Sequence, residues 1–425
     1  MPDSQPSEPP AASAAVQLSS LLGGVGLLVL GNGLLGTLVG VRAGLEEMSG
    51  RTIGLIMSAY FVGYVIGSLT ASRLVERVGH IRAFAALASV VSAFSLGFAV
   101  FLSPSTWIAL RLVYGACFAG LLIIAESWLN ASAPRDQRGR ILGVYMVVTY
   151  AAWGLSQQLL NAAPPGGFVL FSLVSVCLSI SLVPVTLTGA RVPGVVRASR
   201  LNLAQLFVIS PLAVVGAFIS GVCNSALFGM GPTFAQQVGF SDREIGFFLG
   251  APLFGALALQ WPLGLISDWI DRRIVLLACA VCAAVLSLVL VDLAFSGVAI
   301  LVASFFLGSA LMPIYSLCVA HANDSVDAKS IVATASAMIL VYGAGSTLGP
   351  LSASLLMREI GPFGLFVLMA LALGAFAGFA VYRMVRTRAP GSEDKHHYVS
   401  VPLTSHAALG LNHRSAVSMG KRAPR

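Results

Sequence analysis

Two ionisable residues, Arg111 and Glu126, interrupt the otherwise apolar stretch from residue 107 to 130. A charged side chain is costly in an apolar environment, so each is a candidate functional group. As a partly desolvated carboxyl group, Glu126 could carry a proton, or it could form a fixed ion pair with arginines of the next loop. On a helix the two residues would be about 22 Å apart, so they cannot pair directly. Arg111 could also extend its guanidinium group to a membrane surface.

Polar and aromatic side chains interrupt the other apolar stretches. The amide and indole groups that could bind a solute, or pack between helices, are Asn32, Gln157, Gln158, Asn224, Gln260 and Trp261. Aromatic residues that could form a wall for a lipophilic or cyclic solute, or serve in packing and in the interfacial belt, are Tyr60, Tyr64, Tyr145, Tyr150 and Trp153.

Enzyme and metal-site patterns are missing from the sequence. It contains no G-x-x-x-x-G-K-[ST] phosphate loop, which argues against an ATP-driven pump on this chain. The six cysteines all fall within apolar stretches, and the six histidines form no cluster with them, so no metal or other cofactor is expected. We therefore predict a protein that is not an enzyme.

The composition indicates that the segments which position these residues span a membrane. Of the 425 residues, 57% are hydrophobic and 10% are charged, whereas soluble domains are about a quarter charged. Twelve apolar segments have about the length of a membrane-spanning helix, and they are continuous rather than alternating, which excludes a β-barrel. They cover residues 15–41, 52–71, 83–102, 107–130, 141–160, 168–188, 209–235, 245–266, 274–293, 298–320, 331–356 and 363–383.

Basic residues give the orientation of these segments. If the N-terminus is cytoplasmic, 20 of the 25 Lys and Arg residues fall on the cytoplasmic side and four fall outside. The positive-inside rule therefore predicts that both termini are cytoplasmic. The basic tail from residue 384 to 425 is expected to be disordered and to interact with the membrane surface rather than with nucleic acid. The first fifteen residues lack Lys and Arg, so the first segment is not expected to be a cleaved signal peptide.

An internal repeat relates the two halves of the chain. A shift of 192 residues superposes SGRTIGLIMSAYFVG, from Ser49, on SDREIGFFLGAPLFG, from Ser241, and it also brings Asn32 onto Asn224. Parallel repeats of this kind are related by a pseudo-two-fold axis along the membrane normal. We predict two six-helix bundles, 15–188 and 209–383, a cytoplasmic linker at 189–208, and cytoplasmic tails at 1–14 and 384–425.

The loops that follow the second and eighth segments, SRLVERVGHIR and GLISDWIDRRI, resemble the cytoplasmic motif of the major facilitator superfamily, G-x-L-x-D-R-x-G-R-[KR]. The first copy departs from it at Ser72, Glu76, His80 and Ile81, and the second at Ile266, Trp269 and Asp271. The R-x-x-x-G pattern at Arg111 and the stretches AESWLNASAPRDQRGR, LQWPLG and LMPIYS are similar to a small bacterial branch related to drug and sugar:proton porters.

The resemblance implies roles for two groups of residues. An acidic residue at a cytoplasmic helix end can bind a neighbouring helix N-terminus and nearby arginines, which would hold an inner gate closed. The gate candidates are Glu76, Arg77, Gly79, Gly264, Asp268, Arg272 and Arg273. Ordinary solvated loop charges are the alternative. In the family, the first, fourth, seventh and tenth helices line a central cavity, which implies that Asn32, Arg111, Glu126, Asn224 and Tyr315 surround it, with Arg111 in charge coupling or anion binding.

One antiporter motif lies in an unexpected helix. The pattern G-x-x-x-G-P is absent from the fifth segment, GVYMVVTYAAWGLSQQ, and a similar GSTLGP occurs at 345–350 in the eleventh. Helix kinking and close packing are therefore expected in the second half, and coupling to export stays open.

The sequence thus predicts an all-α integral membrane protein with twelve transmembrane helices and the fold of the major facilitator superfamily. The expected function is secondary transport of a small solute by alternating access, with protons as the candidate coupling ion and export of a lipophilic, drug-like or sugar-like compound favoured. A membrane sensor built on the same fold and an uncoupled facilitator are the alternatives. We expect a monomer in a bacterial inner membrane, with no nucleic-acid partner.

Overall fold

The computed structural model describes residues 11–132, 137–187, 203–292, 297–326 and 330–386, and all of its regular structure in these ranges is helical. The helices of the first half are α1 (Ala11–Leu45), α2 (Gly50–Val78), α3 (His80–Val100), α4 (Pro104–Ser132), α5 (Arg138–Gln158), η1 (Leu159–Ala162), α6 (Val169–Ile180) and α7 (Leu182–Leu187). Those of the second half are α8 (Leu203–Ile209), α9 (Pro211–Gln237), α10 (Asp242–Trp269), α11 (Arg272–Asp292), α12 (Val298–Leu311), α13 (Pro313–Asn323), α14 (Ile331–Ile360) and α15 (Gly364–Arg386).

Each of the twelve predicted segments is helical, and two of them are divided. The sixth segment is split into α6 and α7, and the tenth is split into α12 and α13 before Pro313. Proline lacks a backbone N–H and is favoured in the first turn of a helix, so a new helix begins there. The short helix α8 occupies part of the predicted linker 189–208, whereas residues 188–202 and most of the two predicted tails lie outside the described residues.

Ten helical stretches are long and apolar enough to cross a membrane by length and composition, counted over the described part of the chain. The two predicted segments that do not reach this standard are 141–160 and 168–188. The first of them forms α5, which begins with two arginines and ends with two glutamines, and the second is interrupted between α6 and α7. These features shorten the continuous apolar stretch of each segment but do not prevent helix formation.

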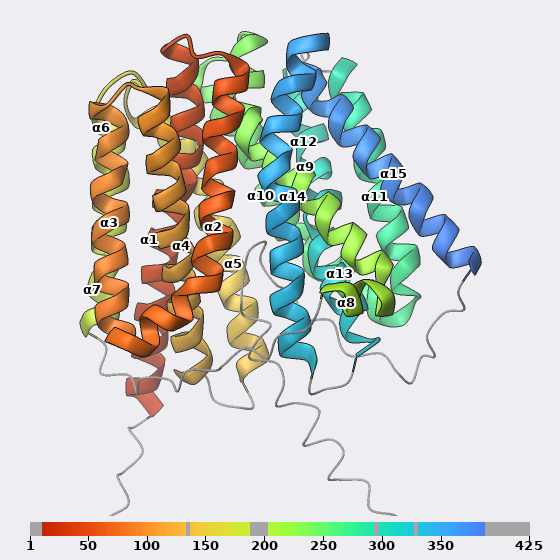
Figure 1. The fold of residues 1–425 in the computed structure, drawn as a ribbon, viewed down its shortest axis with the longest axis horizontal. Helices are drawn as coiled ribbons and strands as arrows, with labels where there is room; N and C mark the ends of the chain where they lie inside the picture. Colours follow the sequence, from red (N-terminus) through yellow and green to blue (C-terminus); the bar gives the residue numbers. More distant parts are fainter. Residues whose placement is uncertain (1–10, 133–136, 188–202, 293–296, 327–329, 387–425) are drawn as a thin grey trace, which may run out of the picture.

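The two halves of the chain form two groups of helices that lie side by side (Figure 1). Within the first group, α2 packs closely against α4, and a Cβ added at Gly63 would collide with the carbonyl oxygen of Leu112. In the second group α10 packs against α12 in the same way, and a Cβ at Gly255 would collide with the carbonyl oxygen of Phe305. Gly63 and Gly255 are separated by the repeat interval of 192 residues, so both halves contain the same close helix contact.

Contacts between the two groups are made by α2 with α14, α5 with α10, and α1 with α9. Gln236 Nε2 donates a hydrogen bond to the carbonyl oxygen of Val41 at 3.0 Å, and Gln158 Nε2 donates one to the carbonyl oxygen of Gly246 at 3.0 Å. Both bonds lie near helix ends that the sequence predicts to be on the outer side of the membrane. The groups are therefore joined at the predicted outer end.

The GSTLGP motif of α14 contributes to packing within and between the groups. A Cβ at Gly345 or Gly349 would collide with backbone atoms of α9. Pro350 contacts the position of Gly54 on α2 and that of Gly229 on α9. This motif thus provides the close packing that the sequence predicted for the second half.

Candidate functional site

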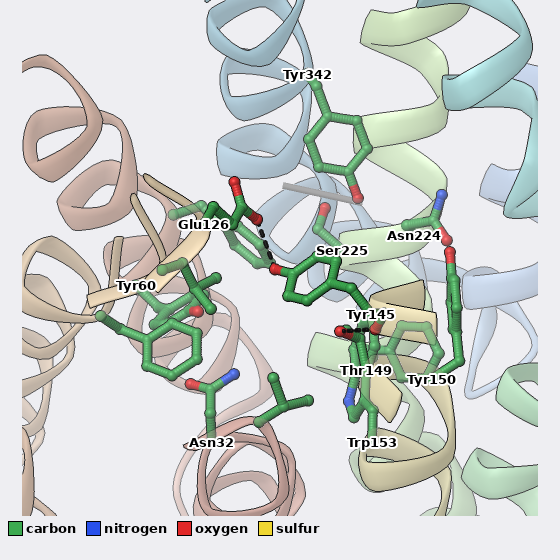
Figure 2. Close-up of a pocket in the computed structure, with 15 residues that line it drawn as sticks. Asn32, Tyr60, Glu126, Tyr145, Thr149, Tyr150, Trp153, Asn224, Ser225 and Tyr342 are labelled. Atoms are coloured by element: carbon green, nitrogen blue, oxygen red, sulfur yellow. Dashed lines mark hydrogen bonds between the residues drawn. The ribbon is translucent and has the colours of Figure 1, made fainter. Parts of the chain in front are cut away.

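A cavity of about 770 Å³ lies between the two groups of helices, and it is lined by residues of α1, α2, α4 and α5 from the first half and of α9 and α14 from the second. Its polar groups are Asn32, Glu126, Tyr145, Thr149, Asn224 and Ser225. Its aromatic groups include Tyr60, Phe61, Tyr150, Trp153, Phe228 and Tyr342 (Figure 2).

The carboxylate of Glu126 is buried at the wall of this cavity, with 2% of the residue exposed. It accepts a hydrogen bond of 2.6 Å from the hydroxyl group of Tyr145 on α5 (Figure 2). This hydrogen bond links α4 to α5. Of the loop arginines that the alternative ion pair would use, Arg140 is exposed, whereas Arg135 and the side chain of Arg138 lie outside what the structure describes.

Arg111 lines a second cavity of about 500 Å³. The two cavities adjoin, because both are lined by Asn32, Tyr60, Phe61, Trp153 and Phe228. Only 2% of Arg111 is exposed, so its guanidinium group does not extend to the surface, and the alternative of an interfacial arginine is wrong. The guanidinium carbon lies 5.6 Å from the ring centre of Tyr60 and 5.7 Å from that of Phe98, which are cation–π distances.

The repeat-related amides Asn32 and Asn224 face the same cavity from opposite halves. Asn224 Nδ2 donates hydrogen bonds to the carbonyl oxygen and the hydroxyl group of Ser220, at 2.8 and 3.1 Å. Its Oδ1 is buried and has no hydrogen-bond partner within the described residues. A buried acceptor of this kind can bind a donor group on a solute.

Six predicted site residues do not line either cavity, namely Tyr64, Gln157, Gln158, Gln260, Trp261 and Tyr315. Gln157 accepts a hydrogen bond from Thr37 and so links α5 to α1, and Gln260 donates one to Ser316 at 3.4 Å. Tyr315 lies one layer behind the wall, with its ring centre 4.8 Å from that of Tyr342. Trp261 is 66% exposed and points to the outside of the bundle.

The comparisons with known proteins agree with this geometry. The family model of the Major Facilitator Superfamily matches residues 21–241 and 213–417. The chain belongs to the major facilitator superfamily. Over 353 residues it is 28% identical to the uncharacterized MFS-type transporter YcaD of Escherichia coli (strain K12 / DH10B), covering 82% of this chain and 91% of that protein.

Solved structures of other facilitators share the fold. The nucleoside transporter NupG superposes with a TM-score of 0.70 at 11% identity, over 89% of this chain and all of that one. A bacterial homolog of the human lysosomal transporter Spinster, inward-facing and unoccupied, superposes with a TM-score of 0.67 at 13% identity, over 99% of this chain and all of that one. At these identities the likeness shows the fold alone. As a member of the superfamily, the protein is a multi-pass membrane transporter and not an enzyme.

In this facilitator, the family's cavity-lining pattern is followed in part. Helices α1, α4 and α9, which correspond to the first, fourth and seventh segments, line the main cavity as the resemblance implied, but the tenth segment does not. Helices α2, α5 and α14 contribute instead. The sequence did not indicate Thr149, Ser225 and Tyr342, because they are neither ionisable at neutral pH, nor amides, nor part of an aromatic cluster. The position of Ser225 next to Asn224 was the available signal.

The two arginine gate candidates of the second half are buried and pair with aspartates. Arg272 pairs with Asp268 at 2.8 Å and with Asp324 of the segment after α13 at 3.0 Å, and Arg273 pairs with Asp271 at 2.7 Å. Although partial burial disfavours the charged form of Asp271, the hydrogen bonds donated by Arg273 hold the pKa of this carboxyl group below its usual value. All these partners belong to the second half, so these pairs do not join the two halves.

The gate candidates of the first half have a different environment. Glu76, Arg77 and Gly79 are exposed, and Gly264 of the second half is buried in α10. Gly79 separates α2 from α3 with a positive φ of 83°, which favours glycine. His80 takes the place that Arg272 has in the second repeat, and its ring packs 5.9 Å from that of Trp128. The loop is therefore held by salt bridges in the second half and by aromatic packing in the first half.

Proposed function

We propose that this facilitator is a proton-coupled secondary transporter that carries a small solute with a large apolar surface by alternating access. The observation that supports the proposal is the cavity lined by aromatic residues between the halves, with Glu126 buried in its wall. Because the groups touch at one end and enclose the cavity between them, a rocking motion of one half against the other would expose it to alternate sides.

Glu126 is the proposed coupling residue. Its two protonation states differ by a full charge in a region of low dielectric constant. The relative free energies of a conformation that admits water to the cavity and of one that excludes it therefore depend on whether the carboxyl group holds a proton. The hydroxyl group of Tyr145 stabilises the charged state in the conformation described. Protonation would remove that stabilisation and shift the population toward the other conformation.

We also propose the orientation predicted from the basic residues, with both termini cytoplasmic in a bacterial inner membrane. The arginines with described side chains at one set of helix ends are Arg73, Arg77, Arg82, Arg140, Arg272, Arg273, Arg383 and Arg386, against Arg42, Arg51, Arg243 and Arg358 at the other. The larger number of arginines at the first set of helix ends supports the proposal that these ends are cytoplasmic. Export remains a prediction that the sign of the measured flux decides.

The test is transport in proteoliposomes. A thermal-shift screen of purified protein against a metabolite and drug library selects the compound that raises Tm most, and the flux of that compound is measured with and without a pH gradient. We expect the gradient to drive flux in the wild type, and Glu126→Gln to abolish the response to the gradient while solute exchange continues.

Glu359→Gln is the matched control, because the side chain of Glu359 is 70% exposed. It should respond to the gradient like the wild type. An unchanged response in Glu126→Gln would refute proton coupling through this residue, and binding without any flux would instead support a sensor.

A further inference from the structure

We infer that the solute carries an acidic group, a carboxylate, which Arg111 binds, while the aromatic wall shared by the two cavities receives its apolar body. This inference rests on the proposed transport function, since it concerns the same site. It specifies the chemical class of the solute as an aromatic or otherwise lipophilic organic anion.

The contacts of Arg111 leave its charge without a counter-ion. Nη2 donates to the carbonyl oxygen of Gly36 at 3.3 Å and lies 3.5 Å from Sδ of Met57. Nε is buried and has no hydrogen-bond partner in the part of the chain that the structure describes. Among the described residues, no carboxylate forms a salt bridge with Arg111. The guanidinium group stays protonated and offers five N–H donors, of which the buried Nε–H is unused among the described residues.

Two other buried arginines of this chain show which partners an arginine with a structural role has. Arg272 is also 2% exposed, and it is paired with both Asp268 and Asp324. Arg273 is 7% exposed and is paired with Asp271. Arg111 is buried to the same extent, but it borders a cavity instead of a carboxylate. A solute carboxylate entering that cavity would supply the missing partner, and it can accept two parallel hydrogen bonds from a guanidinium group.

The surroundings of Arg111 fit the rest of such a solute. Tyr60 and Phe98 lie near the guanidinium group, but neutral rings do not cancel its charge. The shared wall of Tyr60, Phe61, Trp153 and Phe228 is aromatic, and the rings of Trp153 and Phe228 are 4.7 Å apart. The buried Oδ1 of Asn224 lies on the other side of the main cavity and could accept from a donor on the solute.

The experiment measures binding to the purified full-length protein in detergent at pH 7.5, by Tm shift and by quenching of tryptophan fluorescence. The probes are phenylacetate, 1-naphthoate and indole-3-acetate, each beside its uncharged primary amide, with sodium chloride at equal concentration to detect binding of an inorganic anion. We expect at least one carboxylate to bind at least tenfold more tightly than its amide, because a hydrogen bond to a charged group is worth about a factor of 10–100 in affinity.

The variant Arg111→Gln should weaken binding of that carboxylate by about 10–100-fold and leave binding of the amide unchanged. Arg358→Gln is the matched control, because the side chain of Arg358 is 69% exposed, and it should bind like the wild type. Should Arg111→Gln fail to fold, Arg111→Lys keeps the charge, loses the planar fork and should give an intermediate loss.

The inference would be overturned by equal affinity for acids and amides, by an unchanged affinity for the acids in the Arg111 variants, or by no binding of any carboxylate. Chloride displacing the carboxylates without any preference for the organic anion would also overturn it. The binding assay does not require transport, so the two tests are independent. A negative binding result would not change the interpretation of the flux experiment on Glu126, and an absence of flux would not change the interpretation of the binding result.

Discussion

At the scale of single residues, the buried charges of this protein fall into two kinds. Arg272 and Arg273 are held by aspartates at helix ends, whereas Arg111 and Glu126 border the cavities between the halves. Burying an ion without compensation costs several kcal/mol, so ions at a cavity are retained where they serve a function. This division separates the residues that we assign to stability from those that we assign to transport.

The Asp271 and Arg273 pair gives a pH prediction for the first kind. The pKa of Asp271 is lowered in the folded protein, so its contribution to stability is present above the unfolded pKa of about 3.9 and is lost as the pH falls through the folded pKa. We expect Asp271→Asn to lower Tm between pH 5 and pH 7. The difference in Tm between the variant and the wild type should become smaller only below about pH 4. Thermal unfolding over this pH series is the measurement; a difference that is the same at every pH would contradict the assignment.

At the scale of the helices, glycine contacts decide how closely α2 approaches α4 and α10 approaches α12. A side chain at Gly63 would collide with the backbone of α4, which cannot move as a flexible side chain could. In membranes, association of helices depends on such close packing because the hydrophobic effect does not drive it between helices in lipid.

The matched substitutions Gly63→Ala and Gly378→Ala test this packing. The first should destabilise the protein by about 1–3 kcal/mol or more through overpacking, and Tm should fall. Gly378 lies in α15 with open space around it, so its substitution should be neutral or stabilising. A Tm for Gly63→Ala that equals that of Gly378→Ala would show that the contact is looser than described.

Hydropathy was sufficient to predict the helices, because a continuous apolar run of about 20 residues has no other stable structure in lipid. It did not predict their ends. For example, α2 continues through Arg73 and Arg77 to Val78, since charges at an interface do not stop a helix. In the site, polarity within an apolar run identified Glu126, Arg111 and Asn224. It could not determine which way Trp261 or Tyr315 points, because that depends on neighbouring helices that are distant in sequence.

In the whole molecule, the proposed transport depends on movement of the two halves about the cavity. The halves are in contact where α5 meets α10, near the predicted outer end, and a Cβ at Gly250 would lie 3.8 Å from Cβ of Gln157. This distance matches the usual Cβ separation in a disulfide. Cysteines at these two positions should therefore form a bond that holds the outer end closed.

The decisive measurement is flux through the double variant Gln157→Cys/Gly250→Cys, made in a background in which the six native cysteines are replaced by alanine. Each single variant, treated with the same oxidant, is the control for damage at either position. Alternating access predicts that the oxidised double variant stops transporting and that reduction of the disulfide restores flux. Transport at the wild-type rate with the cross-link fully formed would contradict the account.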